Sequence, residues 1–266
     1  MKIAIITGAS SGMGMEFAKA IAKEESLDEI WLVARRLDRL EALAESLKEI
    51  APGIIARPIS LDLTDKNATA TYQDLLKEAK PTVSILVNGS GFGKFGRFED
   101  IPLEEYDNMI DLNTKSLVAL TYVTLPYMTE GSLIYNIDSL SSVQPVPLIN
   151  VYGATKAFVL SFSRALNVEL KPKGIRTIAV CPGWVNTEFF KRAIHDETIK
   201  YFSKVFEPED VVKRAIRDMK KGKDVSVLGA SIRLQVLATK LLPHRLVMKI
   251  WMNQQKTSKN TDKIYK

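Results

Sequence analysis

Three side chains in the second half of the chain could together handle a proton: Ser139, Tyr152 and Lys156. Residues four apart lie one turn apart on the same face of a helix, so the Lys156 ammonium can approach the Tyr152 phenol. A neighbouring positive charge favours the phenolate and lowers the pKa of a tyrosine. Such a tyrosine can exchange a proton with an alcohol or carbonyl oxygen, to which Ser139 can also donate a hydrogen bond. On their own, however, Tyr/Lys pairs are common on exposed helices.

A glycine-rich turn near the N-terminus supplies the second feature. Residues 2–6 form a short apolar run typical of a buried strand, and a helical pattern begins after Gly14. Between them the spacing is T-G-x-x-x-G-x-G, with glycines at Gly8, Gly12 and Gly14. Glycines at a strand-to-helix turn let the backbone approach a pyrophosphate, whose charge then meets the N–H groups and positive end of the helix. The turn therefore indicates a dinucleotide site.

Together these features resemble the short-chain dehydrogenase/reductase family, and the resemblance covers roughly residues 1–230. The matching pieces occur in the family's order: the turn from Thr7 to Gly14, Asp62 in SLDLTD, Asn88-Gly89-Ser90-Gly91, Asn113 in DLNTKSL, the set Ser139, Tyr152 and Lys156, and Pro182-Gly183 with Thr187.

The resemblance implies a role for each of these residues. It makes Asn113, Ser139, Tyr152 and Lys156 catalytic, with Asn113 in a water-linked proton relay and Lys156 also holding the nicotinamide ribose. The cofactor-binding residues that it implies are Gly8, Ser10, Ser11, Gly12, Met13, Gly14, Arg35, Arg36, Asp62, Leu63, Asn88, Gly89, Tyr152, Lys156, Pro182, Gly183, Val185 and Thr187.

The chain departs from the family pattern near the catalytic serine and in the N-N-A-G stretch. Gly89 and Ser90 replace the usual N-A, which we expect to alter loop packing rather than chemistry. Asp138 stands where a serine often precedes the catalytic serine, and Ser142 stands where glycine is common. Successive side chains of a strand alternate in direction, so we expect Asp138 to point away from the site.

The charge after the second expected strand favours NADP(H) over NAD(H). An acidic residue at that strand end would accept the ribose 2′-hydroxyl of NAD, whereas an arginine accommodates the 2′-phosphate of NADP. The chain reads Ala34-Arg35-Arg36 there, with no acid at the turn. Arginine suits a phosphate because its planar fork binds two oxygens. The alternative is that Arg36 merely opens an exposed amphipathic helix.

Alternating strand-like and helical segments predict one α/β domain, a Rossmann-like doubly wound parallel sheet with helices on both faces. The expected strands cover residues 3–7, 30–33, 54–60, 83–87, 133–137, 175–180 and 225–228. Several are continuously apolar, as expected where both faces of the sheet are covered. We divide the chain into a catalytic domain, residues 1–230, and an amphipathic basic extension, residues 231–266, packed on or near it.

The net charge of +6 belongs entirely to the C-terminal extension. Residues 240–266 contain seven Lys or Arg and one acid, while residues 1–239 contain thirty residues of each sign. A spread basic surface is absent, which argues against nucleic-acid binding. Two amphipathic helices are expected around Pro243, one with Leu234, Leu237, Ala238, Leu241 and Leu242 on its apolar face and one with Leu246, Val247, Ile250 and Trp251. They could cover the substrate cleft or a neighbouring subunit, rest on an anionic membrane surface, or extend the core.

The sequence does not favour a disulfide, a metal site, secretion or a membrane-spanning segment. One cysteine, Cys181, rules out an internal disulfide, and with His195 and His244 it offers no metal-binding spacing. No secretory signal or membrane-spanning stretch is recognisable, so a cytoplasmic location is expected.

Apolar side chains in the expected loop after Ser139 (Val143, Pro145, Val146 and Leu148) and aromatic side chains in two further loops, after Gly91 and after Gly183, predict a bulky, mainly apolar carbonyl substrate, such as a ketosteroid, an acyl ketone or a xenobiotic ketone. The aromatic side chains are Phe92, Phe95, Trp184, Phe189, Phe190, Tyr201, Phe202 and Phe206. We expect an NADPH-dependent reductase that forms a homodimer or homotetramer. The alternatives are an enzyme that mainly oxidises the corresponding alcohol, and a non-catalytic NADP-binding sensor or scaffold.

Overall fold

Seven apolar segments of the chain form one parallel sheet in the computed structural model, which describes residues 1–194, 198–202 and 204–257. The order across the sheet is β3-β2-β1-β4-β5-β6-β9, and all neighbouring strands are parallel. The strands are β1 (Lys2–Thr7), β2 (Glu29–Ala34), β3 (Ile55–Ser60), β4 (Thr82–Asn88), β5 (Leu133–Ile137), β6 (Arg176–Val180) and β9 (Val225–Ser226). The predicted strands and the α/β fold class are confirmed, with β9 two residues shorter than expected.

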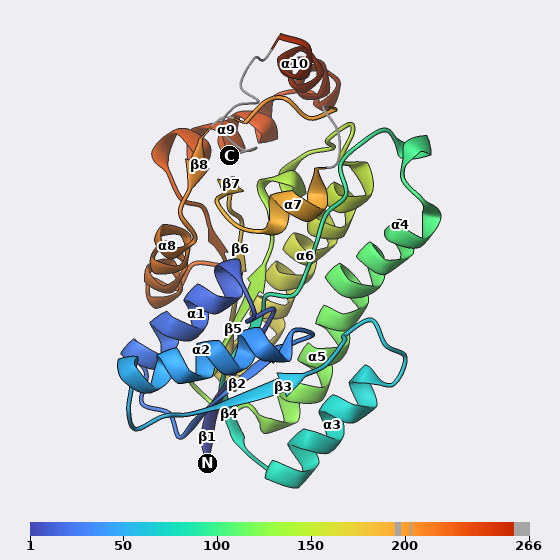
Figure 1. Ribbon diagram of the computed structural model, residues 1–266. Coiled ribbons are helices and arrows are strands. Elements are labelled where there is room, and N and C mark those ends of the chain that lie inside the picture. Colours follow the sequence, from blue (N-terminus) through green and yellow to red (C-terminus); the bar gives the residue numbers. More distant parts are fainter. Residues whose placement is uncertain (195–197, 203, 258–266) are drawn as a thin grey trace.

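Helices cover both faces of this sheet (Figure 1). One face carries α1 (Gly12–Glu24), α2 (Leu37–Ile50) and α8 (Pro208–Lys220), and the other carries α3 (Ala68–Ala79), α5 (Ser116–Thr124) and α6 (Asn150–Glu169). Side chains of β1 alternate between the two faces, so Ile6 packs with Phe17 of α1, whereas Ile5 belongs to the core with Tyr72 of α3. Burial on both sides explains why β1 is apolar at successive positions.

The strand order reverses direction between β1 and β4, and a doubly wound sheet opens a crevice at the carboxyl ends of its strands at such a point. Segments beyond this edge frame the crevice. They are α4 (Leu103–Ile110), which runs through a π-helical stretch (Asp111–Lys115) into α5, the short helix α7 (Phe189–Ala193), and a pair of strands, β7 (Trp184–Val185) and β8 (Val205–Phe206). The β7–β8 pair was not predicted from the sequence.

The C-terminal part forms two helices, α9 (Ala230–Leu241) and α10 (His244–Thr257), that break at Pro243 as predicted. Both lie at the carboxyl-end side of the sheet, near α7 (Figure 1). The predicted apolar face of α9 does not point inward, because Leu234, Leu237 and Leu241 are exposed while Ile232 and Thr239 are buried. Among the described residues, none of the helices has both the length and the apolar character needed to cross a bilayer.

Candidate active site

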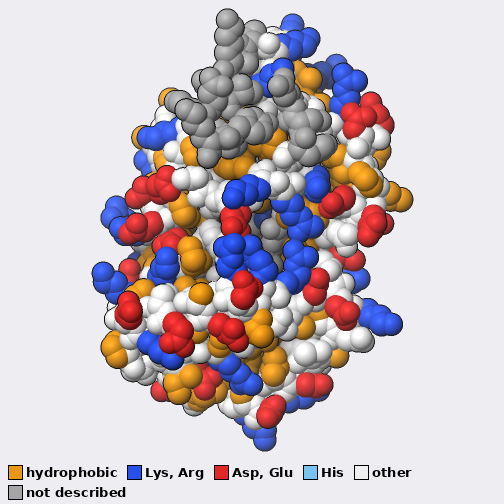
Figure 2. Space-filling view, in the orientation of Figure 1, with side chains coloured by type: hydrophobic (Ala, Val, Ile, Leu, Met, Phe, Trp, Pro, Cys, Tyr) orange, Lys and Arg blue, Asp and Glu red, His pale blue; other side chains and the backbone are white. Residues whose placement is uncertain are grey.

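A cleft of about 980 Å³ opens at the carboxyl ends of the strands. Lys and Arg side chains gather around the middle of this face of the molecule (Figure 2), where Arg35, Arg36, Lys94, Lys191 and Arg192 line the cleft. Most of the predicted site residues line it too: Gly8, Ser10, Ser11, Gly12, Met13, Gly14, Arg35, Arg36, Asp62, Leu63, Gly89, Ser139, Tyr152, Lys156, Pro182, Gly183, Val185 and Thr187. Within the part of the chain that the structure describes, Asn88 and Asn113 do not line it.

The glycine-rich turn forms one end of the cleft. Gly8 has φ +70°, and a Cβ on it would lie 2.6 Å from the carbonyl oxygen of Gly89. A Cβ on Gly14 would lie 2.3 Å from the carbonyl oxygen of Gly8, so neither position admits a side chain. Helix α1 has no acidic residue in its first turn, and its N-cap residue, Ser11, makes no capping hydrogen bond with its side chain to a described residue. The positive end of α1 is thus available to an anion.

The predicted catalytic side chains come together at the other end of the cleft. Ser139 lies two residues after the end of β5, while Tyr152 and Lys156 lie one turn apart on α6 and are 7% and 5% exposed. Lys156 Nζ lies 5.8 Å from the centre of the Tyr152 ring and donates a hydrogen bond of 2.7 Å to the carbonyl oxygen of Ile137. The Ser139 side chain acts on Tyr152 and lowers its pKa, while Ser139 Oγ accepts a hydrogen bond of 3.1 Å from the backbone N–H of Ser141. The spacing in the sequence therefore produces the expected constellation.

The pKa of Tyr152 shifts opposite to the direction expected from the sequence. Burial raises it well above the ordinary value of tyrosine, the hydrogen bond with Ser139 lowers it, and the charge of Asp138 raises it further. The pKa of Lys156 is lowered by burial, against the attraction of Asp138. Excluding water from the phenol makes its ionisation costly, and this cost exceeds any gain from the neighbouring ammonium.

Asp138 does not turn away from the site as expected. It lines the cleft, its side chain is 2% exposed, and its charge acts on both Tyr152 and Lys156. Cys181 Sγ donates a hydrogen bond of 2.9 Å to Asp138 Oδ2, while Oδ1 has no hydrogen-bond partner among the described residues. Burial raises the pKa of this carboxyl to about 7, although Cys181, Lys156 and Ser142 lower it.

Asn113 uses its whole amide to hold the loop after β4. Its Nδ2 donates to the carbonyl oxygen of Phe92 (2.9 Å) and to Thr155 Oγ1 (3.1 Å), and its Oδ1 accepts from the backbone N–H of Phe92 (3.0 Å). A Cβ on Gly91 would lie 3.0 Å from Asn113 Oδ1 and 3.6 Å from Lys156 Nζ, so Asn113 adjoins the catalytic lysine. The Asn113 amide therefore positions the loop at Phe92. Only the backbone of Asn113 remains free to take part in the expected water-linked proton relay.

Asn88 is also a positioning residue. It is 3% exposed, and its Nδ2 donates to Thr121 Oγ1 (3.0 Å) and Asn136 Oδ1 (2.8 Å). These bonds tie the end of β4 to α5 and β5. Its side chain therefore fixes the two strands that flank the cleft, and the contact of Asn88 with the cofactor stays a prediction.

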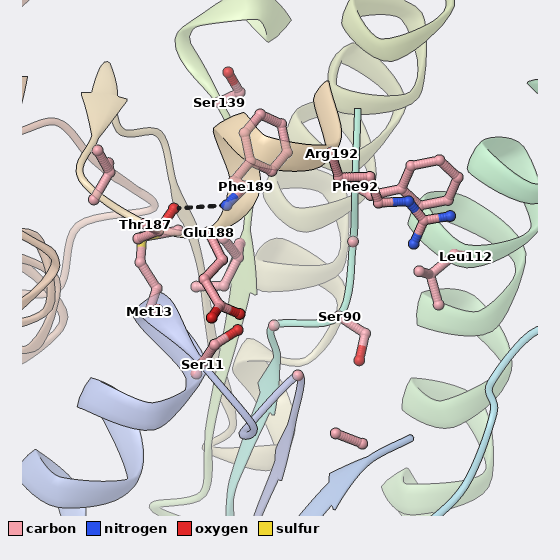
Figure 3. Close-up of a pocket in the computed structure, with 18 of the residues that line it drawn as sticks. Ser11, Met13, Ser90, Phe92, Leu112, Ser139, Thr187, Glu188, Phe189 and Arg192 are labelled. Carbon is pink, nitrogen blue, oxygen red and sulfur yellow. Dashed lines mark hydrogen bonds between the residues drawn. The ribbon is translucent and has the colours of Figure 1, made fainter. Parts of the chain in front are cut away.

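An acidic residue that the sequence analysis missed, Glu188, reaches the glycine-rich turn from the segment before α7. Its carboxylate accepts from Arg36 Nη1 (2.9 Å), and Arg36 Nη2 donates to Ser10 Oγ (3.0 Å) and Ser11 Oγ (2.9 Å). Figure 3 shows Glu188 pointing toward Ser11. Arg35 lies 3.7 Å from Asp62. The only signal for Glu188 in the sequence was its place directly after Thr187.

Aromatic rings surround Tyr152 on the remaining side of the cleft. The ring centres of Phe95 and Phe189 lie 5.7 Å and 5.5 Å from that of Tyr152, and Phe92, Trp184 and Phe190 also line the cleft. Three of the expected aromatic residues pack behind these instead, away from the cleft: Tyr201, Phe202 and Phe206.

Two of the cations on the substrate side share one carboxylate. The Arg192 guanidinium lies 3.5 Å from the centre of the Phe92 ring (Figure 3), and Arg192 and Lys94 both form ion pairs with Glu105, at 3.8 Å and 3.2 Å. In the described ranges no group of three His, Cys, Asp or Glu side chains could hold a metal ion. His195, one of the two histidines considered for a metal, lies outside those ranges.

Comparison with known proteins agrees with this geometry. A family model described as short chain dehydrogenase matches residues 2–198. The chain belongs to the short-chain dehydrogenase family. It is 37% identical over 194 residues to sulfoacetaldehyde reductase 2 of Chromohalobacter salexigens, a match that covers 70% of this chain and 74% of that protein.

Solved structures of other short-chain dehydrogenases share the fold. A short-chain dehydrogenase from Sphingobium yanoikuyae in complex with NADPH is 32% identical, with a TM-score of 0.78 and coverage of 94% of this chain and 96% of that chain. The bulky-bulky ketone specific alcohol dehydrogenase from Comamonas testosteroni is 28% identical, with a TM-score of 0.73 and coverage of 94% of each chain. As a short-chain dehydrogenase, the protein is an oxidoreductase that acts on alcohol or carbonyl groups.

Proposed function

We propose that the protein is an NADPH-dependent reductase of ketones whose substituents are bulky and mainly apolar, and that it also catalyses the reverse oxidation of the secondary alcohol. One observation carries the proposal. Aromatic rings surround the group of Ser139, Tyr152 and Lys156. This group lies in the same cleft as the glycine-rich turn at the N-terminal end of α1.

The residues at the turn fit a dinucleotide phosphate. Gly8 and Gly14 leave no side chain between the backbone and a bound pyrophosphate, and the positive end of α1 faces the same space. NADP(H) is favoured because two arginines, Arg35 and Arg36, follow β2 where an NAD enzyme would carry an acid. A related enzyme solved with NADPH supports the same choice. When bound, the cofactor supplies or accepts the hydride.

The protein's own residues would manage the proton and the carbonyl oxygen. The hydroxyl groups of Ser139 and Tyr152 would donate hydrogen bonds to that oxygen, and Tyr152 would then transfer its proton to it. Burial raises the pKa of Tyr152, so the phenol holds its proton at neutral pH, which is the state that reduction requires. Lys156, fixed by the carbonyl oxygen of Ile137, would stabilise the phenolate left behind.

The aromatic lining of the cleft favours a substrate with bulky, mainly apolar substituents. Phe92, Phe95, Trp184, Phe189 and Phe190 offer apolar surface beside Tyr152. Lys94 and Arg192 share the single carboxylate of Glu105, which offsets one of their two positive charges. The related alcohol dehydrogenase specific for bulky-bulky ketones points to the same class of substrate.

A panel of ketones of increasing bulk tests the proposal, with NADPH consumption followed by absorbance. Turnover should be measurable with the bulky aryl and alicyclic ketones and should fall by ~10²-fold or more in Tyr152→Phe, which keeps the ring and loses the proton donor. The matched control is Tyr122→Phe, an exposed tyrosine on α5, which should leave turnover unchanged. Near-normal turnover in Tyr152→Phe with any accepted ketone would contradict the mechanism.

A further inference from the structure

The outward faces of α9 and α10 expose a set of large apolar side chains. On α9, Leu234, Leu237 and Leu241 follow the spacing of one helical stripe and are 67%, 53% and 76% exposed. On α10, Leu246 and Ile250 lie one turn apart and are each 43% exposed. Single exposed leucines are ordinary, but a group of this kind at helical spacing indicates an interaction surface. We call these five side chains the apolar stripe.

The exposure does not come from helices that are detached from the protein. Trp251 Nε1 donates a hydrogen bond of 3.0 Å to the carbonyl oxygen of Pro147, in the loop that follows Ser139. Gln255 Oε1 accepts from the backbone N–H groups of residues 200 and 201, at 2.9 Å and 3.0 Å. Val247 is buried as well. One side of α10 is therefore anchored, whereas Leu246 and Ile250 on the same helix remain exposed.

Positive charge surrounds the apolar stripe without any acid to balance it. Residues 230–257 contain five Lys or Arg and no Asp or Glu. All five cations are exposed, and none forms an ion pair with the residues that the structure describes: Arg233, Lys240, Arg245, Lys249 and Lys256. By contrast, residues 1–229 contain 29 Lys or Arg and 30 Asp or Glu. The partner of this surface must accept both leucines and cations.

We propose that the outward surface of α9 and α10 rests on anionic phospholipid membranes. Helices that carry an apolar stripe flanked by Lys and Arg lie in the plane of the interface, with the apolar side chains at the acyl boundary and the cations at the headgroups. The negative surface potential of an anionic leaflet attracts clustered cations within about a Debye length. The charge of this surface is complementary to such a leaflet over its whole length.

A second copy of the chain fits the surface poorly. A two-fold interface brings the same patch of both subunits together. Here it would set five unbalanced cations against five more, without an acid from either α9 or α10. An anionic lipid surface offers apolar contact to the leucines and negative charge to the cations, whereas a second copy of the chain offers only apolar contact.

The membrane-facing surface would lie close to the catalytic cleft. Helices α9 and α10 lie at the same end of the molecule as α7 (Figure 1), which borders the cleft, and Trp251 is bonded to the loop after Ser139. Apolar molecules dissolved in the bilayer would thus be concentrated beside that loop.

Flotation of the full-length protein with lipid vesicles tests the proposal. One set of vesicles contains phosphatidylcholine alone, and the other contains phosphatidylcholine with one part in three of phosphatidylserine. At low salt we expect at least tenfold more protein on the anionic vesicles, and we expect added salt to release it because it screens the charges.

Two sets of substitutions separate the two attractions. Replacing Leu234, Leu237 and Leu241 by serine removes apolar contact and keeps the charge, while replacing Lys240, Arg245 and Lys249 by glutamine does the reverse. Each set should reduce binding about tenfold or more and leave ketone reduction in solution unchanged. The matched controls lie elsewhere on the surface and should bind as the wild type does: Tyr122→Ser with Val168→Ser for the apolar set, and Lys48→Gln with Lys77→Gln and Lys115→Gln for the charge set.

Equal binding of the wild type to neutral and anionic vesicles would overturn the proposal, as would undiminished binding in either set. A third result would also overturn it: no vesicle binding by the wild type, together with a native mass that falls when the three leucines are replaced. In that case the surface is occupied by a second copy of the chain.

Discussion

Replacing Asp138 by asparagine measures the cost of the carboxyl group buried beside the catalytic residues. Burial raises its pKa to about 7 from an ordinary value of 3.8, in spite of the hydrogen bond from Cys181 and the charge of Lys156. The difference is about 3 pKa units. At about 1.4 kcal/mol per unit, the ionised carboxylate destabilises the native state by roughly 4 kcal/mol relative to the protonated acid.

The sign of the pH dependence follows from this difference. Because the pKa of the Asp138 carboxyl is higher in the folded than in the unfolded protein, the native state keeps a proton that the unfolded state releases between about pH 4 and pH 7. The free energy of unfolding of the wild type therefore loses this contribution as the pH rises through that window. Asparagine has nearly the same shape, can still accept the Cys181 hydrogen bond and has no proton to lose. The variant should gain up to about 4 kcal/mol over the wild type between pH 4 and pH 8.

Urea unfolding of the two proteins at a series of pH values measures this gain. The control is Asp218→Asn, at a second buried aspartate. Burial raises the pKa of Asp218, but hydrogen bonds with Arg214, Lys223 and Ser226 outweigh it and leave the pKa below its ordinary value. Asp218 is ionised in both the folded and the unfolded protein above about pH 4, so this control should be less stable than the wild type by an amount that stays constant from pH 4 to pH 8, unlike Asp138→Asn. A stability difference for Asp138→Asn that stays constant from pH 4 to pH 8 would refute the reasoning.

Catalysis gives an independent measurement on the same variant. The charge of Asp138 raises the pKa of Tyr152, so removing it should lower that pKa. Alcohol oxidation needs the deprotonated tyrosine, so its rate should rise at a lower pH in Asp138→Asn than in the wild type. A stability gain without this displacement of the pH profile would mean that the carboxylate does not act on the tyrosine.

Three further predictions concern the cofactor and the assembly. In titrations of the free enzyme, Arg35→Ala should weaken NADPH binding by about tenfold or more, since a charge-assisted hydrogen bond contributes about 1.5 kcal/mol or more. The same variant should barely affect NADH binding. An equal loss of affinity for both cofactors, or a wild type that prefers NADH, would contradict the NADP assignment. Glu188→Gln should tighten NADPH binding several-fold, because it frees Arg36 from a competing carboxylate, and NADH binding serves as its control. If the protein forms a homo-oligomer through α6, placing a charge at the exposed Phe158 (Phe158→Glu) should lower the native mass measured by light scattering, and an unchanged oligomer would exclude that face.

The strands and motifs could be predicted because their signals are local. The apolar run of β1 is buried on both faces, Gly8 has φ +70°, and Gly14 is required by a backbone contact within the turn itself. Tyr152 and Lys156 are one helical turn apart in any helix, whatever surrounds it. These elements could therefore be located from the sequence, and the structure has them at the predicted positions.

Three features could not be predicted because they depend on contacts between distant segments. The direction of Asp138 depends on Cys181, whose sulfur lies on the neighbouring strand end. The shift in the pKa of Tyr152 depends on how completely water is excluded, which spacing along a helix does not reveal. The leucines of α9 have the pattern of a core face, yet Ile232 and Thr239 are the residues that turn inward.

Three consecutive residues before and within α7 connect the ends of the cleft. A Cβ on Gly12 would lie 3.1 Å from Thr187 Cγ2, Glu188 is bonded to Arg36, and the Phe189 ring packs 5.5 Å from that of Tyr152. The backbone N–H of Phe189 also donates to Thr187 Oγ1 (Figure 3). A phosphate that binds Arg36 in place of the Glu188 carboxylate must displace Glu188. The next residue, Phe189, packs against the catalytic Tyr152. We therefore expect Glu188→Gln to change the KM for the ketone together with the affinity for NADPH, because the phosphate end and the catalytic end of the cleft share one short segment of chain.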